Sequence, residues 1–159
     1  MKKLIILLFV MVYGLVLAGC SSKQEQSEPE SLVGHIVIED NILHVDKVEI
    51  ITREDVGRIE ELGLQQDSFP NGYHIYNPDT EKDTYELTGE TVYNFVDVHR
   101  LFIKDGDGDR SYTTTKKEEF LQHLSTSYSD VPPAQKVPFF LEVKDGKVIS
   151  VTEEFKFTI

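Results

Sequence analysis

The stretch LVGHIVIEDNILHVDKVEII, residues 32–51, decides the fold. Apolar and polar residues alternate through most of it, and the polar pair Asp40-Asn41 interrupts the alternation. This pattern predicts a hairpin with a two-residue loop. The apolar phase changes between Val45 and Val48, so we expect a bulge near Asp46-Lys47. In this register the apolar side chains that share one face are Ile36, Ile38, Leu43 and Val45.

Two helices are marked by the residues at their ends. The first is expected to begin at Thr52, a good N-cap, and to end at Gly63, which fits the left-handed position that follows many helices. The second is expected to begin with Thr115 and Glu118 at capping-box spacing and to run to about Ser125. Its apolar stripe predicts three buried residues, Phe120, Leu121 and Leu124.

Short strands account for most of the remaining chain, and the helices interrupt hairpins rather than alternate with strands. This order predicts an α+β fold with a mostly antiparallel sheet. The long opening hairpin, the bulge and the helix before the last hairpin favour a small OB-like barrel. An open antiparallel sheet with helices on one face is the alternative. Strands are expected at 73–76, 83–87, 91–96 and 100–104, and in a final hairpin at 137–144 and 147–157.

The composition argues against several classes of protein. The 159 residues contain 28 Asp and Glu against 16 Lys and Arg, a formal net charge of −12. Nucleic acid is therefore not an expected partner, because its phosphates favour Lys and Arg. A single Cys excludes an internal disulfide framework and a Cys-based zinc cluster. An apolar content of 40% is too high for a disordered chain and too low for a polytopic membrane protein. We expect no cofactor.

The first residues predict export. Two lysines precede an apolar run at residues 4–18, which is shorter than the roughly 20 residues of a membrane-spanning helix. The tetrapeptide Leu17-Ala18-Gly19-Cys20 resembles the lipobox of bacterial lipoproteins, a family in which the Cys thiol receives a diacylglycerol and the bond before it is cut. The resemblance implies a signal peptide at residues 1–19 and a mature protein that begins with lipidated Cys20.

Residues 20–31 are expected to form a lipidated, disordered tether, because after Cys20 they contain no apolar residue. A single globular domain is expected at 32–159. Cleavage would remove two lysines and leave 14 Lys and Arg against 28 acids, a net charge of −14. Anionic lipids would repel such a body, so acyl chains must hold it at the membrane. The expected location is the extracytoplasmic face of the cell membrane.

Three stretches of the body are similar to a group of small Bacillus-type secreted lipoproteins. The similarity would extend over most of residues 34–157. No activity is assigned to that group, so the similarity implies no site, but it does imply a Gram-positive envelope. The stretches are GYHIYNP at 72–78, YTTTKKEEF at 112–120 and PFFLEVKDGKVISVTE at 138–153.

Histidines and tyrosines on the predicted strands supply two candidate sites. His35 and His44 would be diagonal neighbours on the first hairpin, with Asp46 opposite His35. A metal or proton site is one interpretation of this group, and we favour the other, a solvated hairpin face. Tyr76 shares its face with His74, which makes these two the candidate ligand-binding residues, for example by aromatic stacking. Ordinary amphipathic packing is the alternative.

A loop of alternating Asp and Gly begins at Asp105 and resembles the start of a calcium loop. Such a loop needs oxygen ligands at positions 1, 3, 5, 7 and 12 and a Gly at position 6. Counting from Asp107 puts Glu118 at position 12 but Tyr112 at position 6. We therefore favour a turn whose acids stay solvated. The candidate calcium ligands would be Asp107, Asp109, Ser111, Thr113 and Glu118.

Motifs of hydrolytic enzymes are missing from the sequence. It contains neither GxSxG nor HExxH, and lipidation would consume the thiol of Cys20. We therefore expect a non-catalytic, lipid-anchored binding or interaction module whose partner, besides membrane lipid, is an unidentified protein or glycan. The alternative is an envelope enzyme that acts on cell-wall or extracellular substrates.

Overall fold

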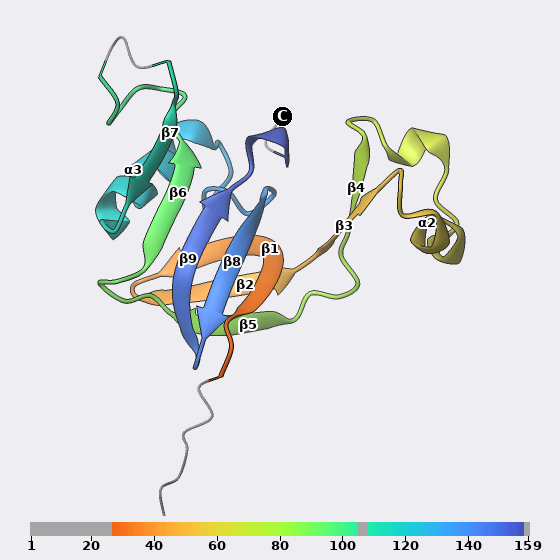
Figure 1. Cartoon of the computed structure of the whole chain (residues 1–159), viewed down its shortest axis with the longest axis horizontal. Helices are drawn as coiled ribbons and strands as arrows, with labels where there is room; N and C mark the ends of the chain where they lie inside the picture. Colours follow the sequence, from red (N-terminus) through yellow and green to blue (C-terminus); the bar gives the residue numbers. More distant parts are fainter. Residues whose placement is uncertain (1–26, 105–107, 158–159) are drawn as a thin grey trace, which may run out of the picture.

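The computed structural model describes residues 27–104 and 108–157. The predicted signal peptide, Cys20, most of the tether and Asp107 therefore lie outside the described residues. The described chain has an α+β fold with two α-helices and a mostly antiparallel seven-stranded sheet, as predicted. A separate two-stranded sheet belongs to an arm, residues 49–76, that stands to one side (Figure 1). We call the large sheet and the helix packed on it the body.

The strands of the body close into a ring. They are β1 (Glu30–Glu39), β2 (Ile42–Lys47), β5 (Lys82–Glu86), β6 (Val92–Val96), β7 (Ser111–Thr114), β8 (Pro138–Lys144) and β9 (Lys147–Glu153). Their order is β5-β2-β1-β8-β9-β6-β7, and a further pairing of Glu86 with Lys147 joins β5 to β9. This ring is consistent with the predicted small OB-like barrel. The first strand begins at Glu30, two residues before the predicted start of the domain.

The opening hairpin has the predicted register. Ile36 pairs with Val45, and Ile38 pairs with Leu43. Three of these side chains are fully buried, and Ile38 packs against the same core. The final hairpin also alternates as expected, since it turns Phe139, Leu141 and Val143 into the core. Its second strand ends at Glu153 rather than at Phe157, because residues 155–157 form a 3-10 helix.

The predicted bulge near Asp46-Lys47 is wrong. The pairing of β1 with β2 continues without a shift to Gly34 and Lys47, where β2 ends. The change of apolar phase instead marks the point where the chain leaves the body for the arm. Gly34 permits the close approach of the two strands here, because a Cβ at this position would lie 2.6 Å from the carbonyl oxygen of Asp46.

The helix α3 (Lys117–Ser127) covers the core of the body. Its buried residues are Phe120, His123 and Leu124, whereas Leu121, predicted to be buried, is 38% exposed. The predicted capping box of Thr115 and Glu118 does not form, since the N-cap is Lys116 and has no side-chain cap bond. The hydroxyl of Thr114, rather than Thr115, accepts the N–H of Lys116 at 3.1 Å and donates to Glu119 at 2.7 Å.

The strand predicted at 100–104 does not form, because one buried carboxylate curls this segment. Asp97 is fully buried and accepts three backbone N–H groups at 2.8–2.9 Å, and these groups cannot then pair in a sheet. Burial by itself would raise the pKa of Asp97, but these hydrogen bonds hold it below its usual value. The donors are Leu101, Phe102 and Ile103.

The arm has a small core of its own, which includes Ile51 and Phe69. Its elements are β3 (Glu49–Thr52), α2 (Val56–Leu62), the short 3-10 helix η1 (Gln66–Ser68) and β4 (Tyr73–Tyr76). The helix is shorter than predicted because Thr52 belongs to β3, where its N–H and hydroxyl donate to the Asp55 carboxylate. It ends at Gly63 as predicted, with φ of 64° and the backbone bonds of a Schellman motif.

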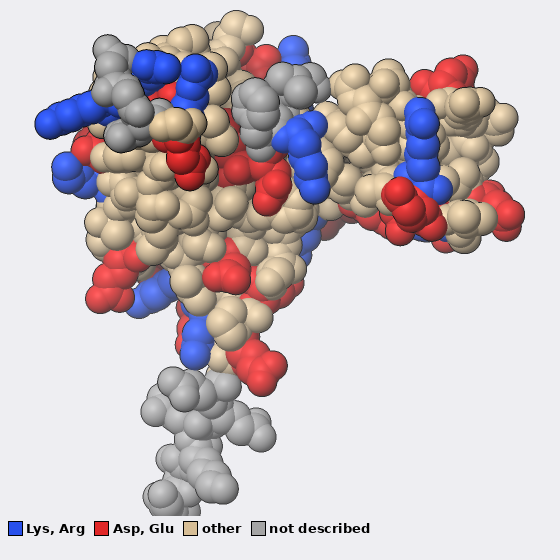
Figure 2. Space-filling view, turned by 45° about the horizontal axis from the view of Figure 1, so that its top comes forward, with Lys and Arg blue, Asp and Glu red and all other residues tan. Residues whose placement is uncertain are grey.

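Aromatic rings join the arm to the body. Phe157, in the 3-10 helix η2 (Phe155–Phe157), meets Tyr73 of the arm edge to face, with ring centroids 4.7 Å apart. The same ring stacks on Phe140 of β8 at 5.8 Å. The Asn77 amide also donates to Asp46 at 3.1 Å. The arm projects as a separate lobe that carries both basic and acidic side chains (Figure 2).

Candidate functional site

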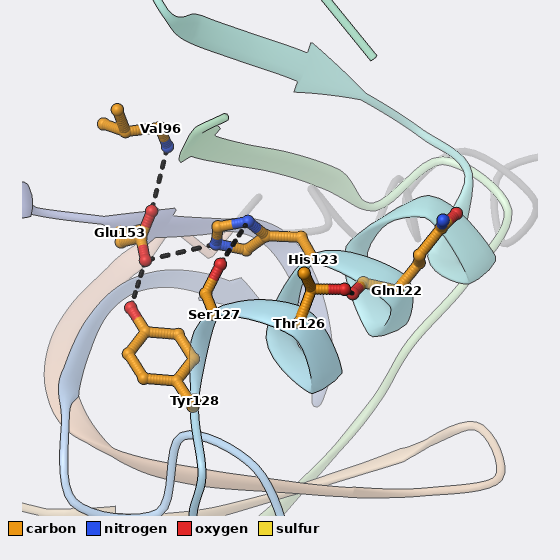
Figure 3. A network of polar contacts seen from close by, with 7 residues as sticks. All are labelled: Val96, Gln122, His123, Thr126, Ser127, Tyr128 and Glu153. Carbon is orange, nitrogen blue, oxygen red and sulfur yellow. Dashed lines mark hydrogen bonds and ion pairs between the residues drawn. The ribbon is translucent and has the colours of Figure 1, made fainter. Parts of the chain in front are cut away.

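A buried carboxylate organises one end of the body (Figure 3). The side chain of Glu153 on β9 is 4% exposed. One carboxylate oxygen accepts the backbone N–H of Val96 at 2.9 Å. The other accepts the hydroxyl of Tyr128 and lies 3.2 Å from Nε2 of His123. The hydroxyl of Ser127 lies 3.3 Å from the second ring nitrogen of His123. We call these five residues the Glu153 network.

The protonation state of the network follows from its hydrogen bonds. Burial by itself would raise the pKa of Glu153, but hydrogen bonds from His123, Tyr128 and Val96 outweigh burial and lower it. Burial and the bond to Glu153 raise the pKa of the Tyr128 hydroxyl, which therefore stays a donor. Because a charged carboxylate can only accept, we assign a ring proton of His123 to Nε2, which donates to Glu153. In a neutral ring, Nδ1 would then accept from the Ser127 hydroxyl.

Ser127, His123 and Glu153 have the donor and acceptor order of a nucleophilic triad, but two features argue against acyl transfer. His123 is 1% exposed, and the ring of Phe95 stacks on it with centroids 4.1 Å apart. Ser127 is the last residue of α3, where the negative end of the helix dipole would oppose an oxyanion. We interpret the network as structural, because it ties β6, α3 and the chain after α3 to β9.

The outward face of the large sheet carries an open hollow of about 760 Å³, which we call the sheet groove. It crosses β1, β8, β9 and β6, and most of its side chains alternate with residues of the core. A row of successive cross-strand partners runs through it: Val33, Phe140, Thr152 and Asn94. A second row consists of Ser31, Glu142, Ser150 and Val92.

Hydrogen bonds connect the polar side chains along these rows. The Asn94 amide donates to the hydroxyl of Thr152 at 3.2 Å, and Thr113 donates to the Asn94 carbonyl oxygen at 2.8 Å. The Ser150 hydroxyl lies 3.4 Å from the Glu142 carboxylate. The groove therefore offers oriented hydroxyl and amide groups beside a half-buried aromatic ring, which is the usual make-up of a ligand site.

The charges of the sheet groove are all negative. Glu142 and Glu154 line it, and none of its described lining residues is Lys or Arg. Neither carboxylate forms an ion pair with another described residue. The groove therefore disfavours anionic ligands, in agreement with the acidic composition of the whole chain.

The candidate ligand residues His74 and Tyr76 lie on β4 of the arm, in neither the network nor the groove. The guanidinium of Arg58 lies 5.2 Å from the centre of the Tyr76 ring. Nδ1 of His74 lies 3.3 Å from the carbonyl oxygen of Ser68. Both side chains therefore make contacts within the arm.

His35 lies directly opposite Asp46, as predicted. Burial lowers the pKa of His35 although the Asp46 carboxylate acts to raise it. Nε2 of His35 and one carboxylate oxygen of Asp46 are buried without a hydrogen-bond partner among the described residues. His44 faces Glu39 instead, at 3.5 Å. Within residues 27–104 and 108–157, no group of three or more His, Cys, Asp or Glu is placed to hold a metal ion.

The calcium candidates are only partly described. Asp109 accepts the N–H of Ser111 at 2.8 Å, while Ser111 and Thr113 lie in the extended strand β7. An extended backbone spaces these two side chains along a line, whereas a calcium loop wraps its ligands around one point. Glu118 lies in the first turn of α3. The solvated turn remains our preferred interpretation.

The pairing of His123 with Glu153 was not predicted, although the sequence places each of them on an inward face. Glu153 follows Val151 by two residues on a predicted strand, so strict alternation places it on the core side. His123 follows Phe120 by three residues, which places both on one helical face. A charged residue at an inward position calls for a buried polar partner.

No protein-family model, curated protein or solved structure matches this chain. Among the described residues, none of the helices has the length and apolar character needed to span a bilayer.

Replacing Glu153 by Gln should lower the free energy of unfolding by roughly 2–5 kcal/mol at pH 7. The reason is that Gln keeps one acceptor oxygen but puts an NH2 group against the donor or donors that the other oxygen served, and a buried donor left unpaired costs about 1–3 kcal/mol. The folded pKa lies below the unfolded value of about 4.3, so the stabilisation is complete above that value and is lost as the pH falls through the folded pKa. Urea denaturation should therefore show the two proteins converging below about pH 4.

The matched control is Glu142→Gln, since Glu142 lies on the same sheet but is exposed. We expect it to change stability by less than about 0.5 kcal/mol. Equal losses in the two variants, or a difference that does not depend on pH, would contradict the structural role of Glu153.

Proposed function

We propose that this protein is a non-catalytic binding module, anchored through lipidated Cys20 at the outer face of the cytoplasmic membrane, that holds its ligand in the sheet groove. The observation that carries this proposal is the groove itself. It joins about 760 Å³ of open space, the Phe140 ring and a set of oriented polar side chains on one face. Such a combination suits ligand binding.

An enzymatic role has less support from the same residues. The two groove carboxylates lie about four residues apart along the hairpin, since Phe139 pairs with Glu153 and Glu142 pairs with Ser150. At about 3.3 Å per residue their backbone positions are roughly 13 Å apart. The carboxyl groups of a glycosidase pair stand about 5–9.5 Å apart, so these two side chains would have to lean toward each other to hydrolyse a sugar. None of the described lining residues is a His or Cys that could activate a hydroxyl.

The position of the first described residue relates the groove to the proposed anchor. The hydroxyl of Ser27 donates to Asp145, in the turn between β8 and β9, at 2.6 Å. Six residues lie between Cys20 and Ser27. The disordered tether predicted from the sequence would have an r.m.s. reach of about 15 Å over this span. The turn would therefore face the membrane. The end of the sheet groove at Ser31 would lie near the membrane, and the end at Glu154 would lie farther from it.

A photo-crosslinking amino acid at Thr152, in the groove, should capture a partner in intact cells of the native host. The same amino acid at Thr84, which is exposed on β5 outside the groove, should capture much less. Comparison of the crosslinked products on gels would measure the difference. Equal capture at the two positions, or none at Thr152, would count against a binding role for the sheet groove.

Cys20→Ala should leave a precursor without acyl chains, because the sequence contains no other Cys. Metabolic labelling with a fatty acid, followed by capture of the protein, would show the loss. Ser21→Ala, a change beside the lipobox that leaves the thiol in place, is the control and should keep the label. Retention of label in Cys20→Ala would refute the anchor.

A further inference from the structure

The two carboxylates of the sheet groove stand at opposite ends of its long axis. Glu142 lies in β8 opposite Ser150, and Glu154 directly follows the end of β9, one residue beyond the pair of Phe139 with Glu153. The separation of roughly 13 Å equals four residues of an extended chain at about 3.3 Å each. In an extended chain, residues four positions apart point to the same side. An extended segment lying along the hairpin would therefore place two such side chains over the two carboxylates.

Phe140 lies midway between these ends. It is two residues from Glu142, pairs with Val33 and is half-buried. The ring of Phe157 stacks against it with an angle of 28° between the planes, which fixes its orientation. The midpoint of the groove is therefore apolar, and an apolar side chain placed two residues from each charged one would lie over it.

Hydrogen-bonding groups flank this axis. Thr152 accepts from Asn94, which leaves its own hydroxyl hydrogen for a ligand carbonyl. Ser150 lies next to the Glu142 end of the groove. These side chains suit the amide groups of a peptide backbone.

The unpaired negative charges of Glu142 and Glu154 determine which charge a ligand of the sheet groove should carry. Covering a carboxylate with a neutral ligand removes it from water without a counter-charge, whereas a cation offsets that cost. Phosphate-bearing lipids or polymers would meet repulsion from both carboxylates and from a chain with a net charge of −12. Electrostatic complementarity therefore favours a basic partner over a neutral glycan or an anion.

We propose that the sheet groove binds an extended polypeptide segment with two cationic side chains four residues apart and an apolar side chain between them. This ligand class rests on the proposed binding function of the same groove and makes it specific. The two carboxylates fix the spacing of the cations, and Phe140 selects the central residue.

A labelled peptide, Gly-Lys-Ser-Leu-Ser-Lys-Gly, tests the proposal in fluorescence anisotropy titrations of the full chain in neutral detergent micelles. Glu142→Gln and Glu154→Gln should each weaken binding about two- to fivefold. The double variant of Glu142→Gln with Glu154→Gln should weaken binding further. The control pair, Glu60→Gln with Glu81→Gln, removes the same two charges from exposed sites elsewhere and should leave binding unchanged. Peptides with adjacent lysines, or with Ser in place of Leu, should bind more weakly than the parent.

A charge reversal gives a readout that loss of folding cannot imitate. Glu142→Lys combined with Glu154→Lys should release the lysine peptide and gain affinity for Gly-Glu-Ser-Leu-Ser-Glu-Gly. Equal effects of the groove and control pairs, or binding that ignores the lysine spacing, would overturn the proposal. If the peptide fails to bind while Thr152 still crosslinks a partner in cells, this ligand class is wrong and the binding function stands. If Thr152 crosslinks nothing either, both are wrong.

Discussion

The buried charge of Glu153 is the constraint on which the rest of the body depends. A carboxylate removed from water is destabilising unless hydrogen bonds compensate it. Here the donors come from three separate places, namely Val96 at the end of β6, His123 within α3 and Tyr128 after α3. None of these elements can move away from β9 without leaving a buried donor or the charge itself unpaired. The need to keep the Glu153 carboxylate hydrogen-bonded therefore fixes α3 and β6 relative to β9.

The same constraint reaches the outer surface. Side chains alternate along a strand, so an inward Glu153 requires outward Thr152 and Glu154. These two residues line the sheet groove, and the position of Thr152 across from Phe140 and Asn94 follows from the pairing of β9 with β8 and β6. The Glu153 network fixes the orientation of β9, and this orientation decides which β9 side chains face outward and line the sheet groove.

The sequence predicted those parts of the fold that local alternation and turn chemistry determine. The first hairpin, the last hairpin and the ending at Gly63 are confirmed because one face of each strand must be buried and one position needs positive φ. The strand at 100–104 was wrong because its amides bind Asp97, a contact that hydrophobic periodicity does not reveal. Leu121 was wrongly placed in the core because the helix turns toward the Glu153 network instead. The sheet groove was beyond prediction because it depends on β1 pairing with β8, more than a hundred residues away.

The ionisation of Glu153 tests this account most directly. The shift of its carboxyl carbon, followed by NMR in the full chain, reports the charge of this one side chain. Hydrogen bonds from three donors predict that it stays charged as the pH falls from 7 to about 4.5 and titrates below the ordinary Glu value of about 4.3. Titration above that value would mean that burial dominates over the hydrogen bonds, and the network could not then be the interaction that organises the fold.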